Sequence, residues 1–134
     1  MTKRLVKVML QRVRNRIRRF NSTGARGERV AARALRRSGM RILARNRCIA
    51  GVEIDLVVHD PRRDEIILIE VKTTADESDG RQRINQEKRR RLARAAMSID
   101  DRNGPVRVEA IGVSLLKPPI IRGCRRPPTD QYGR

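Results

Sequence analysis

The sequence predicts one α/β domain in which two helices and four strands follow in the order αβββαβ. Two segments carry apolar residues at helical spacing beside cap-type residues, which predicts the two helices. Between them, two runs rich in Val, Ile and Leu flank a polar turn, which predicts a β-hairpin. The chain has 134 residues, of which 38% are hydrophobic, enough for one core.

The first helix and the first three strands follow closely along the chain. Cap-type residues at 21–23 and Gly39 after Ser38 bound a helix over residues 24–38. A turn-type sequence at 60–64 separates the second strand from the third, whose start is apolar on both faces, as in a central strand. The three strands are expected at residues 41–45, 52–59 and 65–72.

The second half of the chain completes the predicted order. A polar loop over 75–82 precedes a helix over 83–99, and a last strand follows at 106–116. Prolines among basic residues after Leu116 indicate a tail rather than a packed element. The expected organisation is a basic extension at 1–20, the domain at 21–116 and a Pro/Arg-rich tail at 117–134.

Residues 1–20 carry basic residues and no acid, and their apolar residues recur at steps of three or four. This pattern predicts an amphipathic helix with a basic back. Such a helix can pack on its own domain, lie along a phosphate backbone or sit on a membrane surface.

The charge of the chain indicates a polyanionic partner. Lys and Arg number 33 against 15 Asp and Glu, which gives a formal net charge of +18. Nucleic acid is the first expectation and an anionic membrane surface the second. Aromatic residues make up 1% of the chain, which argues against proteins that stack bases on aromatic rings, so the backbone is the expected contact.

No apolar run approaches the roughly twenty residues of a membrane span. The N-terminus also lacks the apolar region of a signal peptide. We therefore expect a cytoplasmic protein without a membrane span.

The third strand and its hairpin partner bring acidic residues together. Glu70 and Lys72 are two residues apart and share a face of the strand. Asp55 and Glu70 each lie about five residues from the turn, so we expect them opposite each other. Facing carboxylates repel unless a cation or proton intervenes, and Mg²⁺ suits such a pair. The alternative is an ordinary ion cluster in which Lys72 neutralises Glu70.

Each helix turns one charged residue toward the sheet. Glu28 lies in line with the apolar residues of the first helix, and Lys88 shares a side with Leu92 and other apolar residues of the second. Local alternatives exist, since a carboxylate is favoured near a helix N-terminus and a lysine stem can cover apolar surface. The arginines of the first helix occupy another arc. The candidate nucleic-acid contacts are Arg26, Arg29, Arg33 and Lys88.

Four motifs follow one another with tight spacing: Gly-Ala-Arg-Gly-Glu-Arg-Val-Ala-Ala from Gly24, Gly-Met-Arg-Ile-Leu-Ala-Arg-Asn from Gly39, Glu-Ile-Asp-Leu-Val from Glu53 and Ile-Glu-Val-Lys-Thr from Ile69. Together they resemble the YraN family of small bacterial proteins. This family belongs to the PD-(D/E)xK nuclease superfamily and is similar in fold to archaeal Holliday-junction resolvases. The resemblance covers about residues 23–114, and one departure is Val52, which separates Gly51 from the Glu-Ile-Asp run.

The resemblance implies a restriction-endonuclease-like αβββαβ core with a mixed central sheet flanked by helices. It implies that Asp55 and Glu70 ligate Mg²⁺ or Mn²⁺, with the backbone carbonyl of Val71 as a third protein ligand. Lys72 would orient or help deprotonate the attacking water, and Glu28 would reach the metal or its water from the first helix. Hydrolysis of a phosphodiester would leave 5′-phosphate and 3′-hydroxyl ends.

Three functions fit these observations. The first is a Mg²⁺-dependent endonuclease acting on DNA, including branched DNA, with DNA favoured over RNA. The second is a non-catalytic nucleic-acid-binding module on the same fold, and the third is a membrane-surface protein that uses residues 1–20. Resolvases of this fold cut two strands as dimers, so the resemblance also implies a homodimer.

Overall fold

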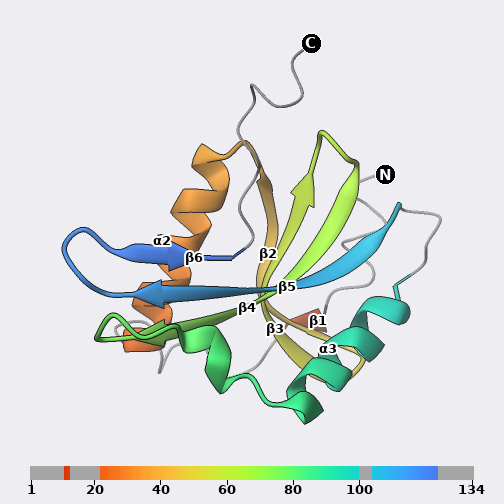
Figure 1. Ribbon diagram of the computed structural model, residues 1–134. Coiled ribbons are helices and arrows are strands. Elements are labelled where there is room, and N and C mark those ends of the chain that lie inside the picture. Colours follow the sequence, from red (N-terminus) through yellow and green to blue (C-terminus); the bar gives the residue numbers. More distant parts are fainter. Residues whose placement is uncertain (1–10, 13–21, 100–103, 124–134) are drawn as a thin grey trace.

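A computed structural model of the chain describes residues 11–12, 22–99 and 104–123 (Figure 1). Within these residues, one six-stranded sheet has its strands in sequence order. Two helices, α2 (Thr23–Arg37) and α3 (Gln86–Met97), flank it. The other elements are β1 (Gln11–Arg12), β2 (Arg41–Ile49), β3 (Val52–Asp60), β4 (Glu65–Thr74), the 3₁₀ turn η2 (Gly80–Arg83), β5 (Val106–Ser114) and β6 (Ile120–Arg122).

The sheet is mixed, because β4 and β5 are parallel while every other neighbouring pair is antiparallel. Parallel neighbours need a crossover, and η2 and α3 supply it between β4 and β5. The predicted α/β class and the αβββαβ order are therefore confirmed.

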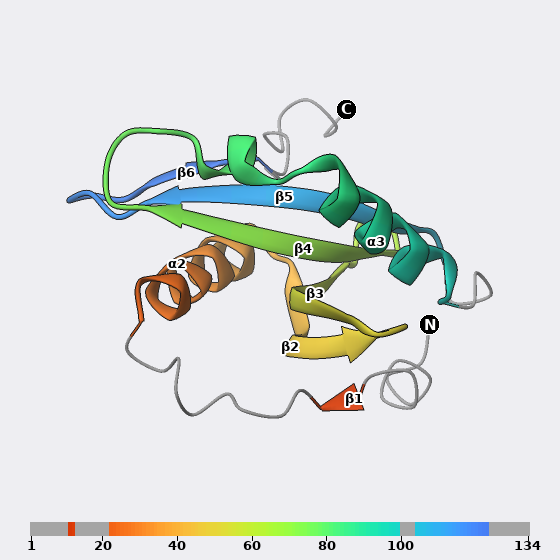
Figure 2. The same cartoon turned by 90° about the horizontal axis from the view of Figure 1, so that it is seen from below.

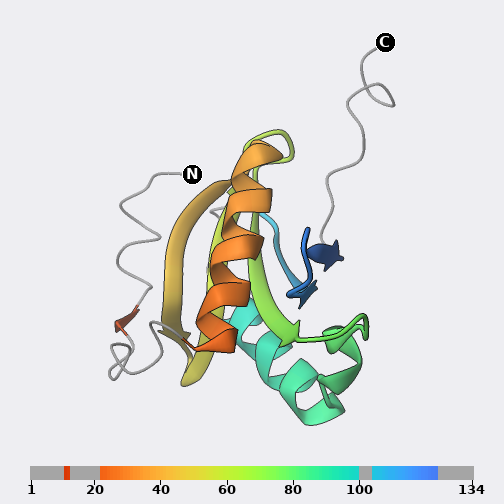
Figure 3. The same cartoon turned by 90° about the vertical axis from the view of Figure 1, so that its left-hand side faces the viewer.

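The helices cover opposite faces of the central strands (Figure 2). On one face, the small residues Ala31 and Ala32 of α2 pack in the core with residues of β3, β4 and β5. Figure 3 shows α2 lying in front of the strands. On the other face, Leu92 and Ala95 of α3 pack in a core formed with β3, β4 and β5. The α2-side core includes Ala31, Ala32, Leu35, Leu56, Val58, Ile67, Ile69 and Ile111, and the α3-side core includes Ala44, Ile49, Ile54, Val57, Ile66 and Leu68.

Several boundaries differ from the prediction for local reasons. Helix α3 begins at Gln86 rather than 83, because the Asn85 side chain accepts a hydrogen bond from the Lys88 N–H at 2.8 Å and caps the helix. Strand β2 runs on to Ile49, well past the predicted end, because its second half pairs with the start of β3.

The folded part of the chain extends beyond the predicted limit at residue 116. Strand β6 pairs with Gly112–Ser114 of β5, so the prediction of an unpacked tail is wrong for residues 120–122. Arg122 donates to Ser114 Oγ at 3.1 Å and to the Glu77 carbonyl at 2.9 Å, which fixes this short edge strand. Pro118 and Pro119 precede the paired residues and so do not interrupt the pairing.

At the N-terminal side, Gln11 and Arg12 pair with Cys48 and Arg47 as strand β1. The helix predicted over residues 1–20 is therefore wrong at these two positions, and its other residues lie outside the described part of the chain. Among the residues that the structure describes, no helix is long and apolar enough to cross a membrane.

Candidate active site

Asp55 and Glu70 meet where the β3–β4 pairing ends. The antiparallel register runs from Asp60 opposite Glu65 to Leu56 opposite Ile69, so Asp55 and Glu70 occupy the next position along. Asp55 Oδ2 accepts a hydrogen bond from the Val71 N–H at 2.7 Å. Asp55 is 8% exposed and Glu70 is 5% exposed. The structure thus brings the two predicted carboxylates together in a buried place.

The pair strongly disfavours two negative charges. Burial, followed by the neighbouring Glu70 carboxylate, raises the pKa of Asp55 to about 8, and the Glu28 carboxylate adds to the rise. The Val71 N–H opposes it by stabilising the ionised form. Without a bound cation, the pair therefore retains one proton near neutral pH.

Strands β2 and β3 both break the alternation of side chains at the level of this pair. Ile54 and Val57, three residues apart, pack on the same α3-side core, as do Ala44 and Ile49, five residues apart. A regular strand sends residues at odd separations to opposite faces. Asn46 adopts a left-handed φ of 51° within β2, which accounts for the break on that strand. Such irregularities redirect side chains, and this one lies beside the carboxylates.

Helix α2 supplies a third carboxylate because its first turn lies close to β4. Gly27 is buried, and a Cβ at this position would overlap the Thr73 hydroxyl oxygen. The next residue, Glu28, is half-buried and accepts a hydrogen bond from Asn46 Nδ2 at 3.2 Å. The structure therefore places Glu28 toward the sheet, as its helical position predicts.

Two lysines lie at Glu70. Lys72 Nζ is 3.4 Å from Glu70 Oε1, and Lys88 Nζ of α3 is 3.7 Å from Glu70 Oε2. Gly80 of η2 packs against the Lys72 backbone, where a Cβ would lie 2.7 Å from the Lys72 carbonyl oxygen. Lys88, a predicted nucleic-acid contact, therefore lies beside the carboxylate pair rather than on the outer face of α3.

The oxygen atoms at this place suit a hard divalent cation. Within the described ranges, no group of three or more His, Cys, Asp or Glu side chains is arranged to hold a metal alone. Mg²⁺, however, commonly uses one or two carboxylates and keeps several waters. Glu70 Oε2 and Asn46 Oδ1 are buried and have no hydrogen-bond partner among the described residues. These oxygens have unused acceptor capacity, which a hydrated cation would use.

The third protein ligand that the resemblance implies is compatible with the backbone. In a β-strand, the N–H and C=O of one residue point to the same side. Since the Val71 N–H points to Asp55, its carbonyl lies on the Asp55 side of β4 as well. Val52, the departure from the family pattern, does not move Asp55 away, because Gly51 takes a φ of 76° in the turn and Val52 pairs with Ile49.

Two cavities form a basic groove along one side of α3, next to Glu70. A cavity of about 260 Å³ adjoins a second of about 710 Å³, and Lys88 and Arg91 line both. The first also contains Glu70 and Lys72, and the second reaches the β2–β3 turn. The basic residues along this groove, here called the α3 groove, are Lys72, Arg83, Lys88, Arg91 and Arg94.

Sequence reasoning missed Arg83, Arg91 and Arg94 as site residues. Lys88, Arg91 and Arg94 recur at steps of three, and this spacing on one helix face could have identified two of them. Arg83 carries no such signal, because η2 is irregular. The predicted contacts Arg26, Arg29 and Arg33 are exposed on α2, away from the α3 groove.

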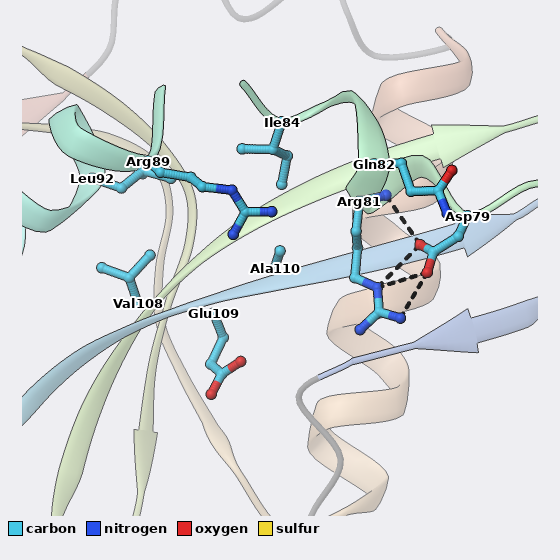
Figure 4. A pocket seen from close by; sticks show the side chains of 9 residues that line it. All are labelled: Asp79, Arg81, Gln82, Ile84, Arg89, Leu92, Val108, Glu109 and Ala110. Carbon is cyan, nitrogen blue, oxygen red and sulfur yellow. Dashed lines mark hydrogen bonds and ion pairs between the residues drawn. The ribbon is translucent and has the colours of Figure 1, made fainter. Parts of the chain in front are cut away.

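A further cavity of about 480 Å³ lies between η2, α3 and β5 (Figure 4). Asp79 and Arg81 face each other across one end of it, with Arg81 Nη2 2.7 Å from Asp79 Oδ2. Ala110 in its floor is the β5 neighbour of Glu70, so this cavity borders the site without containing its carboxylates.

The fold is that of an α/β protein with a restriction-endonuclease-like core. It combines a mixed sheet, two flanking helices and an acidic cluster where the β3–β4 pairing ends. The profile of the uncharacterised protein family UPF0102, the YraN family, matches residues 27–113. The chain belongs to this family.

Its relatives include UPF0102 proteins of three bacterial genera. One from Mycobacterium sp. strain JLS is 40% identical over 99 residues, covering 69% of this chain and 73% of the relative. One from Pelobacter propionicus is 37% identical over 84 residues, covering 61% and 60%. One from Xylella fastidiosa is 41% identical over 75 residues, covering 54% and 60%.

Proposed function

We propose that the protein is a metal-dependent endonuclease that hydrolyses phosphodiester bonds in nucleic acid, with DNA as the preferred substrate. The observation that carries the proposal is the buried pair of Asp55 and Glu70 with Lys72 beside it and Glu28 approaching from α2. A nuclease-like fold alone would not suffice, because folds host many functions.

The residues fit distinct roles in the hydrolysis. Asp55, Glu70 and the Val71 carbonyl would hold Mg²⁺ or Mn²⁺. A bound divalent cation supplies Lewis-acid stabilisation of phosphate charge and lowers the pKa of water. Lys72, half-exposed and held by Gly80, extends from the pair toward solvent and can contact the scissile phosphate and orient the attacking water. The products would carry 5′-phosphate and 3′-hydroxyl ends.

The α3 groove supports a phosphate-binding role. Arg83 and Arg94 make no ion pair within the described part of the chain, and Arg91 pairs only with the exposed Glu87 at 2.9 Å. Arginine forks match phosphate oxygens, and phosphate contacts position a nucleic acid without reading its sequence. With Arg26, Arg29 and Arg33 on α2, such contacts would hold the backbone on both sides of the carboxylates.

The second candidate is a nucleic-acid-binding module without catalysis. It is favoured by Lys72 and Lys88 at Glu70, because these two cations offset buried carboxylate charge without a metal. Metal binding separates the two candidates, since a pure binding module has no need of a cation at Asp55 and Glu70.

The decisive experiment measures cleavage of labelled duplex, single-stranded and four-way-junction DNA, and matching RNA, with Mg²⁺, Mn²⁺ or EDTA. Asp55→Asn and Glu70→Gln should each lower metal-dependent cleavage by about a thousandfold, because each removes a ligand charge worth several kcal/mol. Lys72→Ala should lower it by about 100- to 1000-fold.

Asp60→Asn is the matched control. Asp60 is buried in the same strand as Asp55, at the other end of the hairpin, and Asn keeps the acceptor for the Arg62 N–H. Its cleavage rate should equal that of the wild type. Salt-sensitive binding of DNA with no cleavage in any metal would instead support the binding module. A homodimer stays a prediction, which sedimentation of the chain with and without junction DNA would test.

A further inference from the structure

Asn46 stands out among the buried polar residues outside the predicted site. It is 4% exposed and lies in β2 between Arg45, which pairs with Leu56, and Arg47, which pairs with Ile54. That register puts Asn46 across from Asp55 on the neighbouring strand. A polar residue buried there, at the level where both strands lose their regular alternation, needs a reason beyond packing.

The backbone of Asn46 adopts an unfavourable left-handed conformation. Its φ of 51° is in the left-handed region, which residues with a side chain rarely adopt and which asparagine tolerates better than most. Unusual backbone conformations of this kind cluster at functional sites. Here the conformation accompanies a side chain that reaches across to α2.

In the carboxamide of Asn46, the nitrogen makes a hydrogen bond and the oxygen makes none with the described residues. Its Nδ2 donates to Glu28 Oε2 at 3.2 Å, and only the amide nitrogen can donate to a carboxylate, which fixes the amide orientation. Its Oδ1 is buried and accepts no hydrogen bond from any residue that the structure describes. Buried polar atoms are normally paired. This oxygen and Glu70 Oε2 therefore indicate a position for a bound water or another polar group.

We propose that Asn46 is a positioning residue of the candidate site, whose amide N–H holds the Glu28 carboxylate toward Asp55 and whose carboxamide oxygen accepts from a water within the site. The inference rests on the proposed function, in which Glu28 acts at the carboxylate pair. Asn46 itself acts through Glu28, and the fold provides it from β2, a strand without any of the predicted site residues.

Asn46→Gly is the sharpest single variant. Glycine accepts the left-handed φ, so the variant removes the carboxamide and leaves the backbone conformation available. We expect kcat to fall by about 10- to 100-fold with KM little changed, and Mn²⁺ affinity measured by calorimetry to fall by about tenfold or more. Asp64→Gly is the matched control, because Asp64 has a φ of 50° in the exposed β3–β4 turn and should retain wild-type cleavage and Mn²⁺ affinity.

A double-variant comparison tests whether Asn46 acts through Glu28. In the Glu28→Gln background, Asn46→Gly should lower kcat little further, because residues acting as one unit are not additive. The exchanged pair Glu28→Gln with Asn46→Asp restores a hydrogen bond with donor and acceptor swapped. It should recover the melting temperature lost in the single variants but not the cleavage rate.

The outcomes separate failure of this inference from failure of the proposed function. Wild-type cleavage and Mn²⁺ affinity in Asn46→Gly, fully additive effects with Glu28→Gln, or recovered cleavage in the exchanged pair would each overturn the role of Asn46 while leaving a nuclease. A wild-type protein that neither binds Mn²⁺ nor cleaves would overturn the proposed function, and the positioning role with it.

Discussion

At the residue scale, the burial of Asp55 beside Glu70 is the main unfavourable electrostatic interaction described in the molecule. An ionised carboxylate loses hydration when it is buried, and a second carboxylate adds repulsion. Three features offset this cost. The pair retains a proton, the Val71 N–H donates to Asp55, and two lysines lie at Glu70. These groups make the site sensitive to both pH and divalent cations.

The raised pKa of Asp55 predicts how stability depends on pH in the metal-free protein. The folded pKa of Asp55, about 8, exceeds the value of 3.8 that it has when unperturbed, so the native state binds the proton more tightly than the unfolded state. The contribution is full below about pH 4 and is lost as pH rises through 8. In EDTA, we expect the free energy of unfolding to fall by a few kcal/mol between about pH 5 and 8.

Urea unfolding of the wild type and Asp55→Asn at both pH values measures this effect. The carboxamide of this variant cannot ionise, so it should lose much less stability at the higher pH, whereas Asp60→Asn should behave as the wild type. Mn²⁺ should raise the stability of the wild type at the higher pH and not that of Asp55→Asn. An equal fall in both proteins would show that Asp55 does not titrate in this range.

At the element scale, the approach of α2 to β4 sets the position of Glu28. Gly27 contacts Thr73, and the helix begins just before it at the Ser22 cap, whose Oγ accepts from the Ala25 N–H at 3.1 Å. The short side chains of Ala31 and Ala32 continue this close contact along the helix. Glu28 thus depends on the packing of a whole helix face.

Gly27→Ala and Gly24→Ala make a matched pair for this dependence. A methyl group at 27 would overlap the Thr73 hydroxyl, whereas one at 24 meets only Ser22 Oγ at 3.9 Å. We expect Gly27→Ala to lose about 1–3 kcal/mol of stability and to lower cleavage, because overpacking displaces the helix. Thermal unfolding and cleavage assays check this. Gly24→Ala should cleave as the wild type and be at least as stable, because alanine favours a helix over glycine. Equal behaviour of the two variants would contradict the close approach.

The loop after β4 offers a second test at this scale. Arg122 of β6 bonds Ser114 Oγ and the Glu77 carbonyl, and Thr74 Oγ1 bonds the Ser78 carbonyl at 3.0 Å. We expect Arg122→Ala to lose about 1–3 kcal/mol, because it removes the side-chain hydrogen bonds that join β6 to β5 and to the loop after β4. Chemical denaturation measures it. Arg62→Ala, in the exposed turn at 61–64, is the control and should stay within about 0.5 kcal/mol of the wild type.

At the scale of the whole molecule, periodicity predicted the elements and two of the inward-facing residues. Glu28 and Lys88 are predicted to face the sheet because each interrupts an apolar helical stripe. Asp55 and Glu70 are predicted to be opposite because they lie at equal distances from the hairpin turn. All four lie together in the structure.

Other site residues leave no periodic signal. Asn46 ends one of the four motifs of the resemblance, but periodicity assigns it no role, because its left-handed backbone breaks the strand alternation. Arg83 lies in a 3₁₀ turn, and the groove it lines forms only when η2 and α3 dock on the sheet. Strand β6 is three residues long, too short for alternation to be recognised, and tertiary pairing alone reveals it.

The last prediction concerns how the molecule as a whole holds nucleic acid. The net charge of +18 predicts tight, nonspecific attraction, but charge alone does not say where the backbone lies. The α3 groove and the α2 arginines make separate predictions. Replacing Arg83, Arg91 and Arg94 together by alanine should reduce the slope of log K against log salt by about 2–3, at roughly 0.9 per phosphate contact.

Replacing Arg26, Arg29 and Arg33 tests the α2 side in the same titration, and Arg62 with Arg63 at the far end of the hairpin is the control pair. If the backbone passes the carboxylates, the groove variant should also lose cleavage at saturating DNA, because mispositioned phosphate no longer meets Lys72. The α2 variant should lose affinity while keeping its rate at saturation. An unchanged slope and rate in the groove variant would place the nucleic acid elsewhere on the molecule, and Lys72 would then lose its assigned contact with the scissile phosphate.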